Sequence, residues 1–245
     1  MNNVDADPDK PRAYKRVLIK LSGEAFLGKR EFGIDPDTVQ AICEEIRDIK
    51  QMGIETGLVV GGGNIFRGIA AQKRGMDRVT GDNMGMLATV INALAIMDTL
   101  EKMGIYTRVM SAVTIEAFCE TYIRRRAVRH MEKGRVCVFA AGTGNPYFST
   151  DTAAALRAME TGSQVLIKAT NVDGVYSADP KKHSDAVFFS RLTYMDVLTK
   201  ELKFIDSTAI SLLKDNHIPL RVIDLNCRGN LIRAVRGEDV GTLVC

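Results

Sequence analysis

The chain has 245 residues, of which 46% are hydrophobic and 26% charged, and its formal net charge is +3. This length and composition are ordinary for one large soluble α/β domain, and the balanced charge argues against a dedicated nucleic-acid-binding protein, which would carry a concentrated basic surface. The five cysteines are scattered without a CxxC pair, which argues against a disulfide framework or a zinc site and fits a reducing compartment.

Short β-rich runs alternate with amphipathic segments, a pattern that favours a parallel sheet covered by helices. The strands are predicted, in chain order, at Val17–Leu21, Leu58–Val60, Tyr106–Met110, Val136–Ala140, Val165–Ala169, Leu220–Ile223 and Thr242–Val244. The helices are predicted at Asp37–Met52, Asp82–Met103, Ile115–Lys133, Asp151–Thr161, Asp206–Asp215 and Asn230–Val235, with a loop or hairpin over Asp173–Ser190.

The sequence gives no sign of secretion or of a membrane span. Residues 1–12 are polar and include Asp and Pro, unlike the apolar core of a signal peptide. The longest uncharged apolar interval, Asn83–Met97, is shorter than the ~20 residues that cross a bilayer. We therefore expect a cytoplasmic protein that binds no membrane. We also expect a disordered tail over 1–13 and a single domain over 14–245, with a division into two lobes as the alternative.

The first chemically unusual segment, Lys20–Gly23, ends the first strand, and ligands of open parallel sheets bind beyond the carboxyl ends of the strands. A lysine in an apolar strand is costly to bury unless it faces a cleft or an anion, and Gly23 lets backbone amides approach phosphate oxygens. A strand-edge lysine with its amine in solvent is equally compatible with this segment alone. Gly23–Lys29 nearly matches a P-loop, but Arg30 replaces the required Ser or Thr, so we reject that interpretation.

Two further strand-end loops have the residues of an anion site. Gly61–Gly63 can wrap anionic oxygens, and Arg67 can clamp a phosphoryl group, although a merely flexible turn is the alternative. Thr143–Thr150 leads into Asp151, which is expected to cap the following helix, and such a helix end also favours anions. The alternative is that Ser149, Thr150 and Asp151 only cap this helix. A fourth segment, Lys168–Tyr176, again pairs a strand end with turn residues.

Other conspicuous residues have simpler interpretations. The arginines at 124–126 and 129 are expected to form a solvated or interface face. The three histidines lie in unrelated contexts without metal-ligand or triad spacing, so no protein metal site is predicted.

Six sequence motifs resemble those of the bacterial UMP kinases of the amino acid kinase superfamily, in the same order and at similar separations from Tyr14 onward. The motifs are KLSGEA (Lys20–Ala25), GGGNIFRG (Gly61–Gly68), GDNMGMLAT (Gly81–Thr89), GTGNPYFSTD (Gly142–Asp151), KATNVDGVYSADP (Lys168–Pro180) and LTYMDVL (Leu192–Leu198). The resemblance implies a three-layer αβα sandwich around a mostly parallel sheet, a homohexamer, and ATP-dependent phosphorylation of UMP with Mg²⁺.

The resemblance also implies roles for individual residues. The expected catalytic residues are Lys20, Arg67, Asp151 and Asp206. The expected ATP-binding residues are Lys20, Leu21, Ser22, Gly23, Gly63, Arg67, Thr170, Asn171, Tyr176 and Asp179. The expected UMP-binding residues are Gly62, Asp82, Thr143, Gly144, Asn145, Pro146, Tyr147, Phe148, Ser149 and Thr150.

Regulation and two alternative functions stay open at this point. Members of this family are commonly activated by GTP and inhibited by UTP; Arg108 and Arg135 match GTP-site positions, but Glu101 and Arg124 replace the His and Trp of some relatives. One alternative is a kinase of the same fold for a carboxylate or carbamate acceptor. The other is a non-catalytic nucleotide-binding oligomer.

Overall fold

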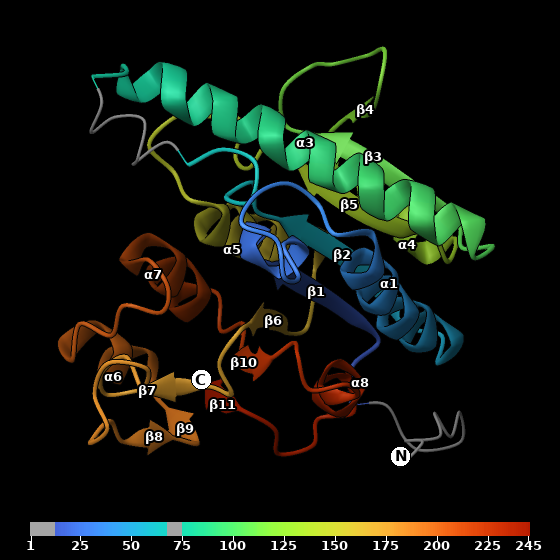
Figure 1. Ribbon diagram of the computed structural model, residues 1–245. Helices are drawn as coiled ribbons and strands as arrows, with labels where there is room; N and C mark the ends of the chain where they lie inside the picture. Colours follow the sequence, from blue (N-terminus) through green and yellow to red (C-terminus); the bar gives the residue numbers. More distant parts are fainter. Residues whose placement is uncertain (1–12, 68–74) are drawn as a thin grey trace.

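A nine-stranded sheet forms the middle layer of the structure, a computed structural model that describes residues 13–67 and 75–245 (Figure 1). The strand order is β4-β3-β5-β2-β1-β6-β10-β11-β9, and among the described strands of this sheet only β10 and β11 pair antiparallel. The strands are β1 Arg16–Leu21, β2 Glu55–Val60, β3 Thr107–Ser111, β4 Glu120–Thr121, β5 Val136–Ala140, β6 Leu166–Thr170, β9 Arg191–Leu192, β10 Leu220–Asp224 and β11 Thr242–Val244. A separate antiparallel hairpin pairs β7 (Val175–Tyr176) with β8 (Phe188–Phe189).

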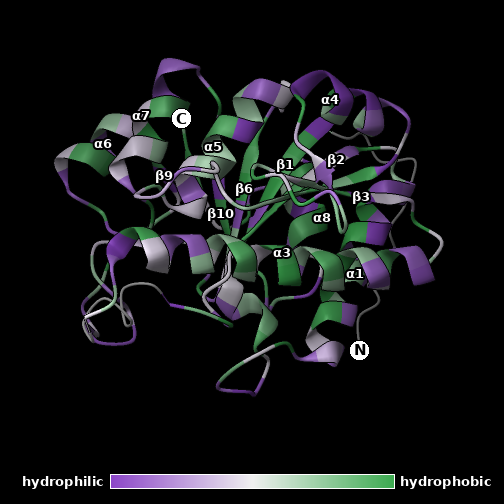
Figure 2. Ribbon diagram, turned by 90° about the horizontal axis from the view of Figure 1, so that it is seen from above, coloured by the Kyte–Doolittle hydropathy of each residue, from purple (hydrophilic) through white to green (hydrophobic). Residues whose placement is uncertain are grey.

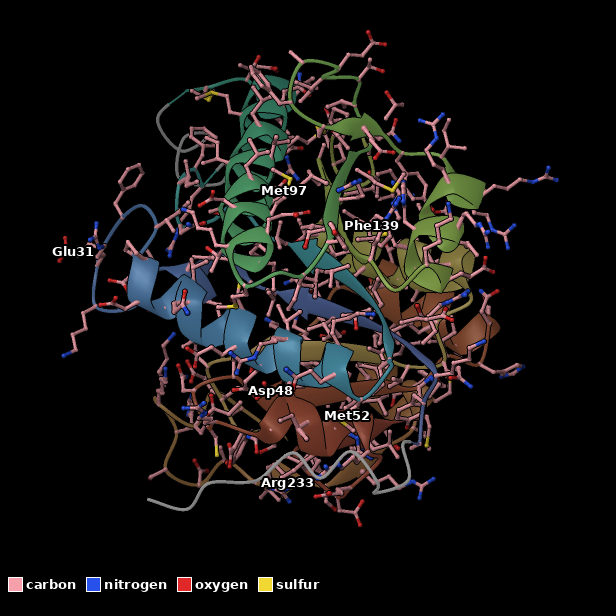
Figure 3. All side chains as sticks on the ribbon, turned by 90° about the vertical axis from the view of Figure 1, so that its right-hand side faces the viewer. Glu31, Asp48, Met52, Met97, Phe139 and Arg233 are labelled. Carbon is pink, nitrogen blue, oxygen red and sulfur yellow. The ribbon has the colours of Figure 1, made fainter. Side chains whose placement is uncertain are left out.

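Helices cover both faces of the sheet (Figure 2). One face carries α1 Pro36–Gln51, α3 Arg78–Lys102 and α8 Asn230–Val235, and the other carries α4 Arg124–Glu132, α5 Thr150–Thr161, α6 Tyr194–Thr199 and α7 Ser207–Asp215. Figure 3 shows α1 and α3 side by side, with α4 across the sheet near Phe139 of β5. The predicted three-layer αβα sandwich is therefore confirmed.

The pleat of β1 shows how the sequence divides the core between the two faces. Val17, Ile19 and Leu21 pack with α1, α3 and α8, whereas Leu18 packs with α5 and its neighbours. Each such side chain is fully buried and contributes roughly 1.5–3 kcal/mol to stability. Lys20 shares the face of Leu18, because successive side chains of a strand alternate. The lysine therefore points toward α5.

Most of the predicted helices and strands are confirmed, including the short Asn230–Val235 helix and the Thr242–Val244 strand, and one long helix is not. The helix predicted at Ile115–Lys133 is wrong over its first half, because only Arg124–Glu132 is helical and β4 joins the sheet edge beside β3. The Tyr122 amide donates to the Ser111 carbonyl, which fixes this extended segment. The short elements α6, β4 and β9 were not predicted. The tail predicted at 1–13 lies outside the described residues apart from Ala13 and stays a prediction, and Gly68 lies outside them too.

Helix α3 is a core helix in spite of its strongly apolar composition. Its 25 residues are long and apolar enough to cross a membrane by those criteria alone. In the structure α3 instead packs on β2, β3, β5 and α1. It begins at Arg78, earlier than predicted, because the Asp77 carboxylate caps it by accepting from the Thr80 amide at 2.8 Å.

Glu45 is a carboxylate buried in the contact between α1 and α8. It is 7% exposed, and its Oε2 has no hydrogen-bond partner in the described structure. Burial raises the pKa of Glu45 to about 7, although amides of Gly229 and Leu231 at the start of α8 hold it down. A raised pKa means that the folded protein favours the protonated carboxyl. Its contribution to the free energy of unfolding is fully present below the ordinary pKa of 4.5 and is lost as the pH rises through about 7.

We expect Glu45→Gln to stabilise the protein at pH 8 and to change little at pH 5. Glutamine does not ionise. The variant therefore avoids the free-energy cost of ionising a buried carboxyl at pH 8, which is roughly 3 kcal/mol at about 1.4 kcal/mol per pKa unit. Thermal unfolding of parent and variant at both pH values measures this difference. A variant that gains no stability relative to the parent between pH 5 and pH 8 would contradict the raised pKa.

Candidate active site

Two lysines and one aspartate form a buried ion cluster at the carboxyl edge of the sheet. Lys20 of β1 and Lys168 of β6 are direct neighbours in the parallel register, so their side chains leave the sheet on the same face. Asp151, in the first turn of α5, lies between them: its Oδ1 is 2.8 Å from the Lys20 amine, and its Oδ2 accepts a hydrogen bond from the Lys168 amine at 2.5 Å. None of the three side chains is more than 14% exposed.

The charges in this cluster control one another. Burial raises the pKa of Asp151, but the two lysine amines outweigh burial and leave that pKa below its usual value. Burial and the nearby Lys20 amine lower the pKa of Lys168 to about 8, with Asp151 acting in the opposite direction. Two amines and one carboxylate give the cluster a formal charge of +1, in a place where water screens little. Such a cluster attracts an anion.

Asp206 joins the N-termini of two helices beside this cluster. It caps α7 by accepting from the Ala209 amide at 2.8 Å, and its carboxylate also accepts from the hydroxyls of Thr152 and Ser149. Of the candidate caps Ser149, Thr150 and Asp151, Asp151 was preferred, and this choice is wrong: the Ser149 hydroxyl caps α5, accepting from the amides of Asp151 and Thr152. The Asp151 carboxylate is thereby left to the two lysines.

The loops after β1 and β2 touch through their glycines. A Cβ atom on Gly23 would lie 2.3 Å from the Gly63 amide nitrogen, so no larger residue fits without a backbone shift. Asn92 of α3 holds the second loop from behind, donating to the Gly61 carbonyl and to the Asn64 side chain, both at 2.7 Å. The two predicted phosphate loops are therefore adjacent. Leu21 is buried in the core, and Ser22 has an extended backbone and directly precedes the short 3-10 helix Gly23–Phe26.

Arg67 lies at the outer side of these glycine loops. Its guanidinium donates to Glu24 Oε1 at 2.7 Å and to the Gly63 carbonyl at 3.0 Å. Within the described residues, its hydrogen bonds do not reach Lys20 or Asp151. The structure thus brings Lys20 and Asp151 together, and places Arg67 on the glycine loops beside them.

A cavity of about 140 Å³ opens between the loops that follow β2 and β5. Its lining includes seven residues predicted for the sites: Gly62, Gly63, Asp82, Thr143, Asn145, Phe148 and Thr150. It also includes six that were not predicted: Phe66, Gly81, Gly85, Met86, Thr89 and Gly142. Asp82 accepts a hydrogen bond from the Tyr147 amide at 2.8 Å, which ties α3 to the β5 loop. Gly144, Pro146, Tyr147 and Ser149 belong to this loop without lining the cavity.

A second cavity, of about 490 Å³, follows the β6 strand end. Tyr176 and Asp179 line it, together with the main chain and side chains of 201–204, which were not predicted. Thr170 and Asn171 do not line this cavity; the Thr170 hydroxyl instead donates to the Val172 carbonyl and shapes the turn. The Tyr176 hydroxyl donates to Asp173 at 2.8 Å, and this bond raises the pKa of the tyrosine.

Lys168 is the main residue that sequence reasoning missed. It stands at the end of an apolar strand, as Lys20 does, so the argument that singled out one lysine applied equally to the other. Asn92 and Thr89 carried a weaker signal, as polar residues in an apolar helix. The Thr89 hydroxyl accepts from the Ala141 amide at 2.7 Å and so supports the β5 loop.

Comparisons with known proteins agree with this geometry. The model of the amino acid kinase family matches residues 15–224. The structure is similar to a UMP kinase from Bacillus anthracis, with 39% identity, a TM-score of 0.92, and coverage of 95% of this chain and 96% of that one. It is similar to a UMP kinase from Ureaplasma parvum, with 36% identity, a TM-score of 0.88, and coverage of 94% and 98%. It is also similar to a uridylate kinase from Archaeoglobus fulgidus, with 28% identity, a TM-score of 0.73, and coverage of 94% and 99%.

Proposed function

The chain belongs to the amino acid kinase family. From that membership and from its similarity to two UMP kinases at 36% and 39% identity, we propose that it transfers the γ-phosphoryl group of ATP to the phosphate of UMP, giving UDP and ADP. The observation that carries this proposal is the position of the ion cluster. Lys20 lies on β1 and Lys168 on the neighbouring strand β6. On one side of them the loops after β2 and β5 line the smaller cavity, and on the other side the segment after β6 lines the larger cavity. Two phosphate-bearing ligands can therefore meet at the cluster.

The chemistry needs alignment and charge compensation rather than a covalent intermediate. An oxygen of the UMP phosphate forms a bond to the γ-phosphorus, the bond to the bridging oxygen breaks, and its electron pair leaves with ADP. No general base is required, because the UMP phosphate is already an anionic nucleophile. The amines of Lys20 and Lys168 face this transfer, and Asp151 orients both of them.

The two cavities and the loops between them support a proposal for the substrate contacts. We propose that Gly62, Asp82 and the Thr143–Thr150 loop bind UMP in the smaller cavity. The amides of Gly23 and Gly63, with Arg67, bind the ATP phosphates. The nucleoside of ATP is proposed to bind in the larger cavity against Tyr176 and Asp179, with Thr170 and Asn171 shaping the turn that leads to it.

Magnesium is proposed to enter as part of the ATP complex. Among residues 13–67 and 75–245, no three His, Cys, Asp or Glu side chains gather as a metal-binding group. Asp151 and Asp206 already accept from lysine amines, hydroxyls and an amide. Mg²⁺ commonly binds through substrate phosphates, water and one or two carboxylates, so this donor set fits an ion held chiefly by ATP. The ion would neutralise phosphate charge in the transfer.

A substrate comparison tests the proposed function. Phosphorylation of UMP, CMP, aspartate, glutamate and carbamate is measured with ATP and Mg²⁺ in a coupled assay for ADP. We expect UMP to be the preferred acceptor. Preference for a carboxylate or carbamate would favour the alternative kinase, and binding of ATP and UMP without turnover would favour a non-catalytic binding protein.

The arginines expected at a GTP site bear on regulation by nucleotides. Arg108 lies 3.5 Å from Glu101 and 3.6 Å from Glu120, and the Arg135 guanidinium lies 2.8 Å from His130 Nδ1. Because these arginines already have partners, activation by GTP is the less favoured outcome, and UTP inhibition stays a prediction. Repeating the assay with each nucleotide decides both. We propose a cytoplasmic enzyme that supplies UDP to pyrimidine nucleotide biosynthesis.

We propose that the enzyme is a homo-oligomer, with the hexamer as the expected form. The support from the structure is an apolar stripe on the outer face of α3: Met84, Leu87 and Ile91 recur at helical spacing and are 39% to 53% exposed. Burying such a stripe against a second copy removes apolar surface from water.

Leu87→Glu is expected to reduce the molecular mass in solution, because it places a charge in the proposed contact. Sedimentation velocity measures the mass of parent and variant. Met195→Glu, on α6, is the matched control, since Met195 is also about half exposed, at 52%. An unchanged mass in Leu87→Glu would remove this stripe from the interface.

A further inference from the structure

Arg157 is a buried charged residue of α5 that contacts the start of the loop after β5. Arg157 is only 5% exposed, and burying a guanidinium destabilises the fold unless the group is paired. It lies on the same helix as Asp151 but outside the ion cluster. Figure 1 shows α5 between the β1 strand and the α7 helix, so the residue is held in a packed part of the fold.

The partners of Arg157 come from three different segments. Its Nη1 donates to Glu160 Oε2 at 2.6 Å, and the hydroxyl of Tyr122 donates to the same oxygen at 2.7 Å. The guanidinium carbon lies 3.9 Å from the centre of the Tyr122 ring, a close cation–π contact. Its Nη2 donates to the Gly142 carbonyl at 3.5 Å. The arginine thus connects the β4 edge of the sheet to the first peptide of the β5 loop.

Tyr122 is itself held firmly under the arginine. Its ring packs edge-to-face on Phe139 of β5, with centroids 5.6 Å apart, and its amide donates to the Ser111 carbonyl. The stacking platform is therefore anchored to two strands of the sheet. A platform with this support can fix the direction of the guanidinium and not only its charge.

The β5 loop needs such support, because its backbone adopts conformations that L-residues seldom adopt. Two of its non-glycine residues have positive φ, Ala141 at 60° and Tyr147 at 72°. The Thr89 hydroxyl holds the Ala141 amide, Asp82 holds the Tyr147 amide, and Arg157 approaches the peptide between them at Gly142. Gly142 lines the smaller cavity, the one assigned to UMP.

We propose that Arg157 is a positioning residue for the acceptor nucleotide: stacked on Tyr122 and paired with Glu160, it fixes the start of the Gly142–Ser149 loop and thereby sets the affinity for UMP. This inference rests on the proposed function. It adds a residue that does not touch the substrate and that acts on one substrate only, because its contacts lie on the side of the smaller cavity.

Arg157→Lys tests the proposal, since lysine keeps the charge but lacks the planar face and the second donor group. We expect the KM for UMP to rise about tenfold, because the variant lacks the stacked and hydrogen-bonded guanidinium. We expect kcat and the KM for ATP to stay within about twofold of the parent. Calorimetric titration with UMP in the absence of ATP is expected to show the same weakening. The matched control is Arg125→Lys on the exposed face of α4, which is expected to leave all three constants unchanged.

The outcomes separate this proposal from the function on which it rests. If the parent enzyme phosphorylates UMP and Arg157→Lys has a KM for UMP within twofold of the parent, the positioning role is refuted. Equal rises in the KM for ATP and UMP would also refute it, because they indicate a general structural defect. If Arg157→Lys does not fold, Tyr122→Leu removes the stacking ring and is expected to give the same selective rise. A parent enzyme that does not phosphorylate UMP would refute the proposed function itself.

Discussion

Replacing Lys20 by alanine is expected to lower kcat for UMP phosphorylation about a thousandfold, in the range found when one preorganised group facing transition-state charge is removed. The amine lies 2.8 Å from Asp151 Oδ1 and is nearly buried, so water cannot take its place with the same geometry. The fold is expected to survive, because Asp151 and Lys168 remain as a neutral pair. Steady-state kinetics and circular dichroism measure the two effects.

Lys15→Ala is the matched control for this variant. Lys15 lies next to the start of β1, at the opposite end from Lys20, and its side chain is 73% exposed. We expect it to retain the turnover of the parent. If Lys20→Ala kept kcat within tenfold of the parent while remaining folded, the cluster would not be the place of phosphoryl transfer.

Much of the site could be predicted from sequence because the carboxyl ends of parallel strands meet at one edge. Lys20, Gly23 and Gly63 follow two strands that are adjacent in the sheet, and the structure places their loops in contact. Asp151 was predicted as a helix cap. It lies in the first turn of that helix, but its carboxylate pairs with lysine amines instead of capping the helix. Local patterns therefore identified the loops, and the sheet topology brought them together.

What could not be predicted depends on tertiary partners. Lys168 resembles Lys20 in its local sequence, but only the register that places it beside Lys20 shows that the two lysines share Asp151. The role of Arg157 depends on Tyr122, which lies 35 positions earlier in the chain and comes from a segment wrongly predicted as helix. Ser149 was one of three candidate caps, and only the positions of both lysines explain why the Asp151 carboxylate turns to them instead. Pairings between distant segments are set by packing, which periodicity does not report.

Asp151→Asn is expected to have the second-largest effect, lowering kcat about a hundredfold. The carboxylate orients two amines that repel each other, and asparagine keeps its shape but not its charge. Without that charge, burial and the Lys20 amine lower the pKa of Lys168 further than in the parent, where it is about 8. Asp215→Asn, on the exposed end of α7, is the control and is expected to retain full activity.

The dependence of kcat/KM on pH, which reports the ionisable groups of the free enzyme, separates this electrostatic role from a merely structural one. An amine with a lowered pKa carries its charge only below that pKa, so the parent is expected to lose activity as the pH rises through about 8. In Asp151→Asn this alkaline limb is expected to move to lower pH, because the carboxylate that raised the pKa of Lys168 is gone. A lower kcat with an unmoved alkaline limb would show that Asp151 acts without controlling the charge of Lys168. A displaced limb would instead show that the aspartate holds the cluster in its cationic form, the form that two adjacent phosphates require.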